Sequence, residues 1–129
     1  MTSQYPENLR YTDTHEYVGL NGQVATVGIT AFAIDQLGDI VFLELPAVGS
    51  TVTQGEAFGT IESVKAVEDL KAPVSGKVLK TNQAMVDAPE ELVNEPYQAG
   101  WLIEIEVSNA GEIDSMMTAA EYRSKVEGQ

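Results

Sequence analysis

One lysine stands where its amine could carry chemistry. Lys65 lies at the middle of a short turn between two apolar, strand-like arms, and no other basic residue occurs between Arg10 and it. Acidic residues flank the turn, namely Glu62, Glu68 and Asp69. A lysine on a tight turn is exposed to water and stays protonated, whereas Schiff-base and general-base lysines are usually buried. We therefore expect Lys65 to be a handle that another protein modifies; the alternative is an ordinary surface lysine.

The residues needed for a metal site or for a catalytic triad are missing from the sequence or occur without their usual motif. His15 is the only histidine and there is no cysteine, so a His/Cys metal site cannot form and no metal site is expected. A Ser-His-Asp triad would depend on His15, without any nucleophile-elbow motif. Glu16 and Asp69 become candidates only if the fold brings them near Lys65. We therefore expect no catalytic residues and a chain that is not an independent enzyme.

The composition is that of a globular chain. Its 129 residues are 43% hydrophobic with a mean hydropathy of −0.09, which predicts one domain over residues 1–129. Apolar runs are too short for a membrane helix, and the first residues show neither a signal-peptide core nor a transit pattern. Because the chain has no cysteine, any sulfur chemistry must use the sulfur of a cofactor.

The charge restricts the partners. The formal net charge is −13, and residues 81–122 contain nine acidic residues and no basic one. Nucleic-acid binding needs clustered Lys and Arg side chains, so we expect neither nucleic acid nor an anionic membrane as a partner. An acidic surface favours solubility and steers the protein toward basic patches on protein partners.

Short strands dominate the pattern. Two β-rich runs are joined by Asn21-Gly22, which favours a type I′ hairpin because both central residues of that turn have positive φ. Further strands are separated by Gly and Pro, as is typical of a sandwich or barrel. The expected strands cover residues 15–20, 23–29, 39–45, 51–53, 57–62, 67–71, 76–81 and 101–107. In the last of these, Trp101, Ile103, Ile105 and Val107 are expected to face the core.

A short helix is expected after the hairpin. Thr30 can cap a helix over residues 31–37 that ends at Gly38. Ile34 and Leu37 would then face inward, because they are spaced by about one helical turn.

The last third of the chain predicts a loop, a strand and a helical tail. Residues 82–100 predict a surface loop with one helical turn near Met85. Two tail helices are expected over residues 110–117 and 119–127. Their starts resemble capping boxes, formed by Asn109 with Glu112 and by Thr118 with Glu121. Met116 and Met117 are expected to fill the core.

Short motifs follow one another in a characteristic order from about residue 5 to residue 127. They include Tyr11-Thr12-Asp13-Thr14-His15-Glu16-Tyr17, Gln36-Leu37-Gly38-Asp39-Ile40-Val41, Glu62-Ser63-Val64-Lys65-Ala66, Ala72-Pro73-Val74-Ser75-Gly76 and Gly100-Trp101-Leu102-Ile103. Together they resemble the H-protein family of the glycine cleavage system. The resemblance implies a mainly β fold, a lipoyl-type barrel-sandwich hybrid of two small antiparallel sheets with short C-terminal helices. The sandwich core would cover about residues 14–107 and the helical extension about 109–127.

The resemblance also implies a carrier function. In the family, the lysine at the position of Lys65 bears lipoic acid in amide linkage. Glu62, Ser63, Val64 and Ala66 would form the modification turn. The amide cancels the lysine charge, and the attached dithiolane supplies the sulfur that the chain lacks.

The implied partners are the other enzymes of the glycine cleavage system. Glycine decarboxylase (with pyridoxal phosphate, PLP) would load an aminomethyl group on the lipoyl-lysine arm. Aminomethyltransferase, with tetrahydrofolate, would remove it, and dihydrolipoamide dehydrogenase, with FAD, would reoxidise the dithiol. Lipoylating enzymes would attach the arm. We expect a monomer when the protein is isolated, in the cytoplasm of a bacterium or in the mitochondrial matrix of a eukaryote.

The family further shelters the loaded arm in a surface cleft. Thr14, Glu16 and Asp69 stand at the matching positions, where a carboxylate pair could hold the charged amine. The chain departs from the family near this cleft: Tyr17 replaces the usual tryptophan, and Phe32 follows Ala31 where the family often has a polar pair. The rim of the cleft is therefore expected to be more apolar here.

Three alternative functions stay open. A biotin carrier domain also modifies a hairpin lysine, but its turn has methionines on both sides, where this chain has Val64 and Ala66. A lipoylated protein could instead donate lipoyl groups to other lipoyl proteins. Without modification of Lys65, the chain would be an interaction module.

Overall fold

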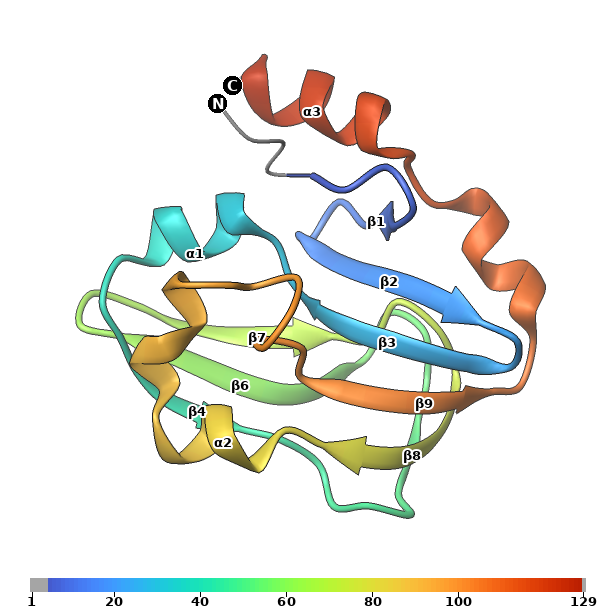
Figure 1. Ribbon diagram of the computed structural model, residues 1–129, viewed down its shortest axis with the longest axis horizontal. Coiled ribbons are helices and arrows are strands. Elements are labelled where there is room, and N and C mark those ends of the chain that lie inside the picture. The colour runs from blue at the N-terminus through green and yellow to red at the C-terminus, as the bar shows by residue number, and fades with distance from the viewer. Residues whose placement is uncertain (1–4, 129) are drawn as a thin grey trace.

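The computed structural model describes residues 5–128, in which nine strands form two antiparallel sheets (Figure 1). The larger sheet has the order β1-β2-β3-β9-β8-β5 and the smaller has the order β4-β6-β7. The strands are β1 (Arg10–Tyr11), β2 (Glu16–Asn21), β3 (Val24–Ile29), β4 (Ile40–Glu44), β5 (Thr51–Val52), β6 (Ala57–Ser63), β7 (Val67–Lys71), β8 (Gly76–Thr81) and β9 (Ile103–Val107). The predicted mainly β fold of two small antiparallel sheets is confirmed.

Both sheets contribute to one core. In β3 and β9 its buried side chains come from alternate positions, so that each of these strands turns one face inward. Val27 of β3, Ile105 of β9, Leu43 of β4 and Ile61 of β6 are all at most 1% exposed and belong to the same cluster. This shared core holds the smaller sheet, which carries the turn at residue 65, against the larger one.

The β2–β3 hairpin turns one residue later than its sequence predicts. Asn21 pairs with Val24, so the two-residue loop is Gly22-Gln23. Gly22 has a φ of 66°, but Gln23 does not have positive φ, because His15 is the only non-glycine residue with positive φ in the described part of the chain. The predicted type I′ turn at Asn21-Gly22 is therefore wrong, since that turn needs two positive φ angles.

The first helix forms as predicted. Helix α1 (Ala31–Leu37) begins after Thr30, whose hydroxyl accepts a hydrogen bond from the backbone N–H of Ala33, and ends at Gly38 with a φ of 82°. Ile34 and Leu37 are buried.

Strand β4 departs from simple alternation. Its pairing with β6 shifts between Ile40 and Phe42, so Ile40 and Leu43 are buried while Val41 and Phe42 are 54% and 44% exposed. A bulge of this kind interrupts the alternation of inward-facing and outward-facing side chains along a strand.

Residues 82–100 contain more helix than one turn. Helix α2 (Gln83–Asp87) is followed by the 3₁₀ helix η1 (Pro89–Val93). The side-chain amide of Asn82 closes this segment by donating to the carbonyls of Ala99 and Trp101 at 2.8 and 2.6 Å. Strand β9 begins only at Ile103, and Trp101 is half-buried, so its predicted core position is wrong.

The tail consists of the 3₁₀ helix η2 (Ala110–Ser115) and helix α3 (Ala119–Glu127). The capping box of Thr118 and Glu121 is confirmed, but Glu112 forms none with Asn109. Its carboxylate instead accepts hydrogen bonds from the N–H and hydroxyl of Ser75. No helix in the described residues is long and apolar enough to cross a membrane.

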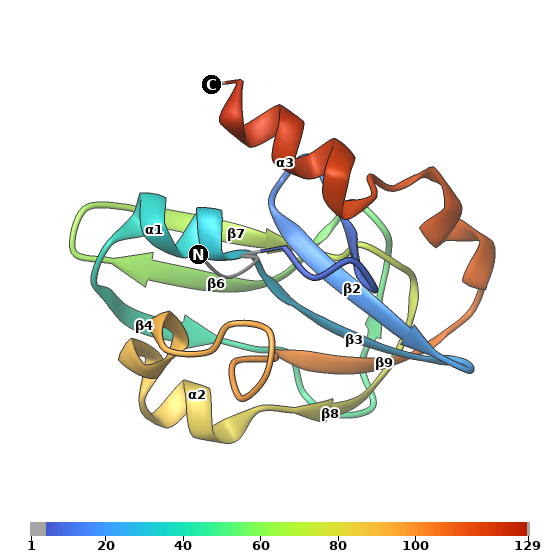
Figure 2. The ribbon, with the colours of Figure 1, turned by 45° about the horizontal axis from the view of Figure 1, so that its top comes forward.

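Helix α3 lies over β1 and β2 in both ribbon views (Figures 1 and 2). It packs there on a second buried cluster, which is rich in tyrosine and separate from the sandwich core. Tyr122 of α3 is fully buried and stacks on Tyr11 of β1, with ring centroids 4.8 Å apart. Met116 is buried in the sandwich core and Met117 packs against the tyrosine cluster, so the methionine pair fills two interiors.

Candidate functional site: an exposed hairpin lysine beside a cleft

Lys65 lies at the tip of the β6–β7 hairpin. The pairing of Glu62 with Val67 leaves a short turn beyond the last paired residues. The hydroxyl of buried Ser63 accepts hydrogen bonds from the backbone N–H groups of Lys65 and Ala66 at 3.2 and 3.1 Å. The N–H of Ser63 donates to the carbonyl of Ala66 at 2.8 Å. A serine hydroxyl that binds the backbone two and three residues ahead commonly stabilises a turn. Here it fixes the backbone from which the lysine side chain extends.

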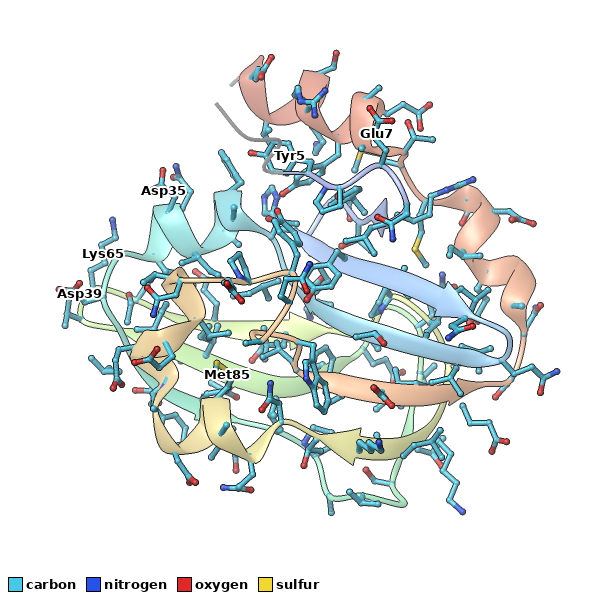
Figure 3. The ribbon with its side chains drawn as sticks, viewed as in Figure 1. Tyr5, Glu7, Asp35, Asp39, Lys65 and Met85 are labelled. Carbon is cyan, nitrogen blue, oxygen red and sulfur yellow. The ribbon has the colours of Figure 1, made fainter. Side chains whose placement is uncertain are left out.

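The tip is exposed and faces away from the body of the molecule. Val64 and Val67 are 71% and 64% exposed, and Lys65 is exposed between them. The N–H of Val64 donates to the carbonyl of Asp39 at 3.1 Å, which ties the turn to the segment after α1. Figure 3 shows Lys65 at the edge of the molecule, on the same side as Asp35 and Asp39. An amine in this position is accessible to another protein.

A cleft of about 440 Å³ opens beside the hairpin. The structure brings Thr14, Glu16 and Asp69 together in its lining, along with Ala66 from the turn. The lining does not include Lys65, Glu62, Ser63 or Val64, which form the stem and tip of the hairpin outside it. The cleft and the lysine turn are thus neighbours joined through Ala66.

One wall of the cleft is helix α1. Phe32, Ala33 and Gln36 line this side. Phe32 makes the rim apolar, as its sequence suggests. Ala31, together with Phe32, lines a second hollow of about 470 Å³ that contains none of the predicted site residues. This second hollow is therefore not the candidate site.

Glu16 is the buried acid of the cleft, with 1% of its surface exposed. Its Oε1 accepts hydrogen bonds from the hydroxyls of Thr12, at 2.8 Å, and Thr14. Its Oε2 accepts from the backbone N–H of Lys71 at 2.9 Å. Burial raises the pKa of the Glu16 carboxyl, and the hydrogen bonds from Thr14, Lys71 and Thr12 oppose that rise because they stabilise the charged form. Within residues 5–128, which the structure describes, the Glu16 carboxyl is thus held by hydroxyl and backbone N–H donors and forms no ion pair.

Sequence reasoning missed several residues of this site. Thr12 was not expected to bind Glu16, although both lie in the same loop, and Lys71 contributes through its backbone, which no side-chain motif signals. His15 was expected to begin a strand, but β2 begins at Glu16 and His15 has a φ of 74°. Asn, Asp and His tolerate this left-handed conformation better than other non-glycine residues, and that preference was the available signal.

The fold and the hairpin define a lipoyl-type carrier protein. A lysine is presented at the tip of the tight turn between β6 and β7 of the smaller sheet, with a cleft beside it. An exposed amine in this position suits covalent attachment of a carried group better than catalysis by the lysine itself.

Comparisons with known proteins give the family. The model of the glycine cleavage H-protein family matches residues 9–129. The chain is 61% identical to the glycine cleavage system H protein of Acaryochloris marina over 128 residues, covering 99% of this chain and 100% of that protein. It is 59% identical to that of a Cyanothece species, covering 99% of both. The crystal structure of a glycine cleavage system H protein from Mycobacterium marinum superimposes with a TM-score of 0.88 at 39% identity, covering 95% of this chain and 98% of the other. The chain belongs to the glycine cleavage H-protein family, the lipoyl carriers of the glycine cleavage system.

Proposed function

We propose that Lys65 is the residue that carries lipoic acid, attached through an amide to its side-chain nitrogen. The observation that carries this proposal is the exposed position of Lys65 on a turn that Ser63 holds from below. The neighbours leave room for a lipoylating enzyme, because Ala66 is small and Val64 points into solvent. The bound group would supply the sulfur chemistry that a chain without cysteine cannot provide.

We infer that the carrier subunit works with three enzymes in turn. The lipoyl-lysine would accept the aminomethyl group of glycine at the PLP-dependent glycine decarboxylase, deliver it at the tetrahydrofolate-dependent aminomethyltransferase and be reoxidised at the FAD-dependent dihydrolipoamide dehydrogenase. Tethering keeps the effective concentration of the group high at each docked active site. The chain itself would present and protect the group without catalysing a step. The similar proteins from bacteria support a cytoplasmic location.

The cleft residues would protect the amine between enzymes. Glu16 and Asp69 offer two carboxylates to a cation, and Thr14 fixes one oxygen of Glu16. An ammonium in the cleft would place a positive charge beside the buried Glu16 carboxylate, which favours its ionised form. Phe32 and Ala66 would limit the access of water to the carbon next to the amine. Thr14, Glu16 and Asp69 are thus proposed as the arm-sheltering residues.

Tryptic mass mapping of the protein from its native cells tests the attachment site. Trypsin cleaves after a free Lys65 and releases a peptide from Tyr11 to Lys65. A lipoylated Lys65 resists cleavage, so the peptide runs from Tyr11 to Lys71 and is heavier by one lipoyl group. Cleavage after Lys71 in the same digest is the internal control. A free lysine in cells with an active lipoylation pathway would contradict the proposal and favour an interaction module.

A second assay separates glycine cleavage from lipoyl donation. Glycine-dependent exchange of carbon dioxide with the purified decarboxylase requires a carrier that accepts the aminomethyl group. We expect the lipoylated protein to support exchange and Lys65→Arg to abolish it. A lipoylated protein that supports no exchange would instead favour the role of lipoyl donor.

A further inference from the structure

Three residues from distant segments form a closed hydrogen-bonded ring next to the cleft. The N–H of Thr30 donates to the backbone carbonyl of His15 at 3.0 Å. The Tyr122 hydroxyl lies 2.8 Å from Nδ1 of His15 and 2.7 Å from Oγ1 of Thr30. A tyrosine hydroxyl donates one hydrogen bond and also accepts, so the ring is complete with either tautomer of His15. Burial raises the pKa of Tyr122, and the hydroxyl keeps its proton.

The ring joins two segments that line the cleft. His15 lines the cleft itself and belongs to the loop of residues 12–16, which also supplies Thr14 and Glu16. Thr30 caps α1, whose first turn supplies Phe32 and Ala33 to the same lining. The rings of His15 and Phe32 also touch, with centroids 4.9 Å apart. The separation of loop and helix is therefore fixed at this point.

The loop contains a residue in the left-handed backbone conformation, and bonds from inside and outside the loop hold it. His15 is the one non-glycine residue of the described chain with positive φ, at 74°, and such conformations persist only when the surroundings enforce them. Within the loop, the N–H of His15 donates to the carbonyl of Thr12 at 3.1 Å. Its side chain is held from outside the loop by Tyr122, which is fully buried in α3. The C-terminal helix thus supplies a bond that the sandwich core does not.

We propose that Tyr122 is a positioning residue for the arm-sheltering cleft. Its hydroxyl sets the position of the loop of residues 12–16 relative to α1, and so directs Thr14 and Glu16 toward the amine of the carried group. The C-terminal extension has a part in protecting that group, although it contributes no residue to the cleft lining. This inference rests on the proposed sheltering role of the cleft.

The test compares Tyr122→Phe with Tyr11→Phe. Both tyrosines are fully buried in the same cluster and their rings stack, but the Tyr11 hydroxyl donates to the carbonyl of Pro6 at 2.7 Å, away from the cleft. Each variant loses one hydroxyl and keeps its ring, but the Tyr122 hydroxyl makes two hydrogen bonds and the Tyr11 hydroxyl makes one, so we expect a somewhat larger decrease in Tm for Tyr122→Phe. Hydrogen exchange of the unmodified proteins gives a readout that does not depend on the arm.

In Tyr122→Phe, we expect the backbone amides of residues 15–16 and 30–33 to lose about tenfold or more in protection, since the hydroxyl makes two hydrogen bonds and each contributes up to about a factor of ten. We expect no such local loss in Tyr11→Phe. In the lipoylated, aminomethyl-loaded proteins, the lifetime of the loaded group should fall about threefold to tenfold in Tyr122→Phe and stay unchanged in Tyr11→Phe.

Glu16→Ala is the reference for the shelter itself. If Glu16→Ala shortens the lifetime and Tyr122→Phe does not, the positioning role is wrong and the shelter stands. If neither variant shortens it, both the shelter and the part of Tyr122 in it are wrong. If Tyr122→Phe and Tyr11→Phe have equal effects on the lifetime and on hydrogen exchange, the ring only stabilises the fold as a whole. That result would also overturn the proposal.

Discussion

Glu16 accepts a hydrogen bond from the backbone N–H of Lys71 at 2.9 Å, although the two residues are 55 positions apart. This bond joins the larger sheet at β2 to the smaller sheet at the end of β7. The same carboxylate binds Thr12 and Thr14 through its other oxygen. One buried acid therefore holds the loop at the cleft against the strand that leads from the lysine turn.

The buried charge of Glu16 gives a pH dependence that can be isolated. Its folded pKa is raised above 4.5, so the folded state binds more protons than the unfolded state between 4.5 and the raised value. The protonated Glu16 carboxyl makes its full contribution to the free energy of unfolding below pH 4.5. This contribution is lost as pH rises through the folded pKa, at about 1.4 kcal/mol for each pH unit between the unfolded and folded pKa values. Glu16→Gln keeps the shape and does not titrate. We expect the free energy of unfolding of wild type minus Glu16→Gln to fall as pH rises from about 4.5 toward the raised pKa.

Urea denaturation at a series of pH values measures this difference. Glu106→Gln is the matched control, because Glu106 lies exposed on β9. Parallel curves for wild type and Glu16→Gln across the whole series would show that the carboxyl has the same pKa in both states.

Ser63 offers a second prediction, on the lysine turn. Ser63→Ala removes the acceptor of the N–H groups of Lys65 and Ala66. We expect a loss of about 1 kcal/mol in the free energy of unfolding and a slower rate of lipoylation, because the turn presents the lysine less often in one conformation. The measurement is denaturation together with a timed lipoylation assay followed by mass spectrometry.

Ser50→Ala serves as its control, since the Ser50 hydroxyl also makes one local bond, to the carbonyl of Ala47 at 2.6 Å. Its lipoylation rate should equal that of wild type. If Ser63→Ala is lipoylated at the wild-type rate, the serine supports the fold and not the presentation of the lysine.

Local chemistry made part of this structure predictable. Helix α1 begins after Thr30 and ends at Gly38 as expected, because an N-cap and a positive-φ glycine act on neighbouring residues only. The strands around Lys65 were also predictable, because alternation and a short turn are local patterns. The position of a lysine at a hairpin tip needed nothing from the rest of the chain.

Features that depend on distant partners were not predictable. The bulge that exposes Val41 depends on pairing with β6, and the backbone at Trp101 is bound by the side chain of Asn82, 19 positions away. The contacts of Glu16 with Lys71 and of Tyr122 with Thr30 span 55 and 92 positions, and no spacing rule reaches so far. The candidate turn could thus be predicted from the residues, whereas the cleft entered only through the resemblance to a family.

Two glycines separate the effects of crowding and of backbone conformation. A Cβ at Gly59 would lie 2.3 Å from the carbonyl oxygen of Glu44 in the neighbouring strand, and backbone cannot move aside easily. A Cβ at Gly49 would meet nothing within 4 Å, but its φ is 94°. We expect Gly59→Ala to cost about 3 kcal/mol through strain between β6 and β4, and Gly49→Ala about 1–2 kcal/mol through conformation alone. Thermal unfolding of both variants checks the order, and a larger loss in Gly49→Ala would contradict it.

The titration of His15 gives the last prediction. Burial lowers the pKa of His15 below 6.5, with a smaller contribution from the charge of Lys125. The unfolded state therefore binds more protons between the lowered value and 6.5, and stability is lost as pH falls through this window. His15→Asn retains a residue that tolerates positive φ and does not titrate. We expect the Tm of wild type minus that of His15→Asn to decrease as pH falls below about 6.5. Proton NMR of the single histidine would locate its pKa directly, and a value at or above 6.5 would contradict the effect of partial burial on His15 and the expected change in Tm.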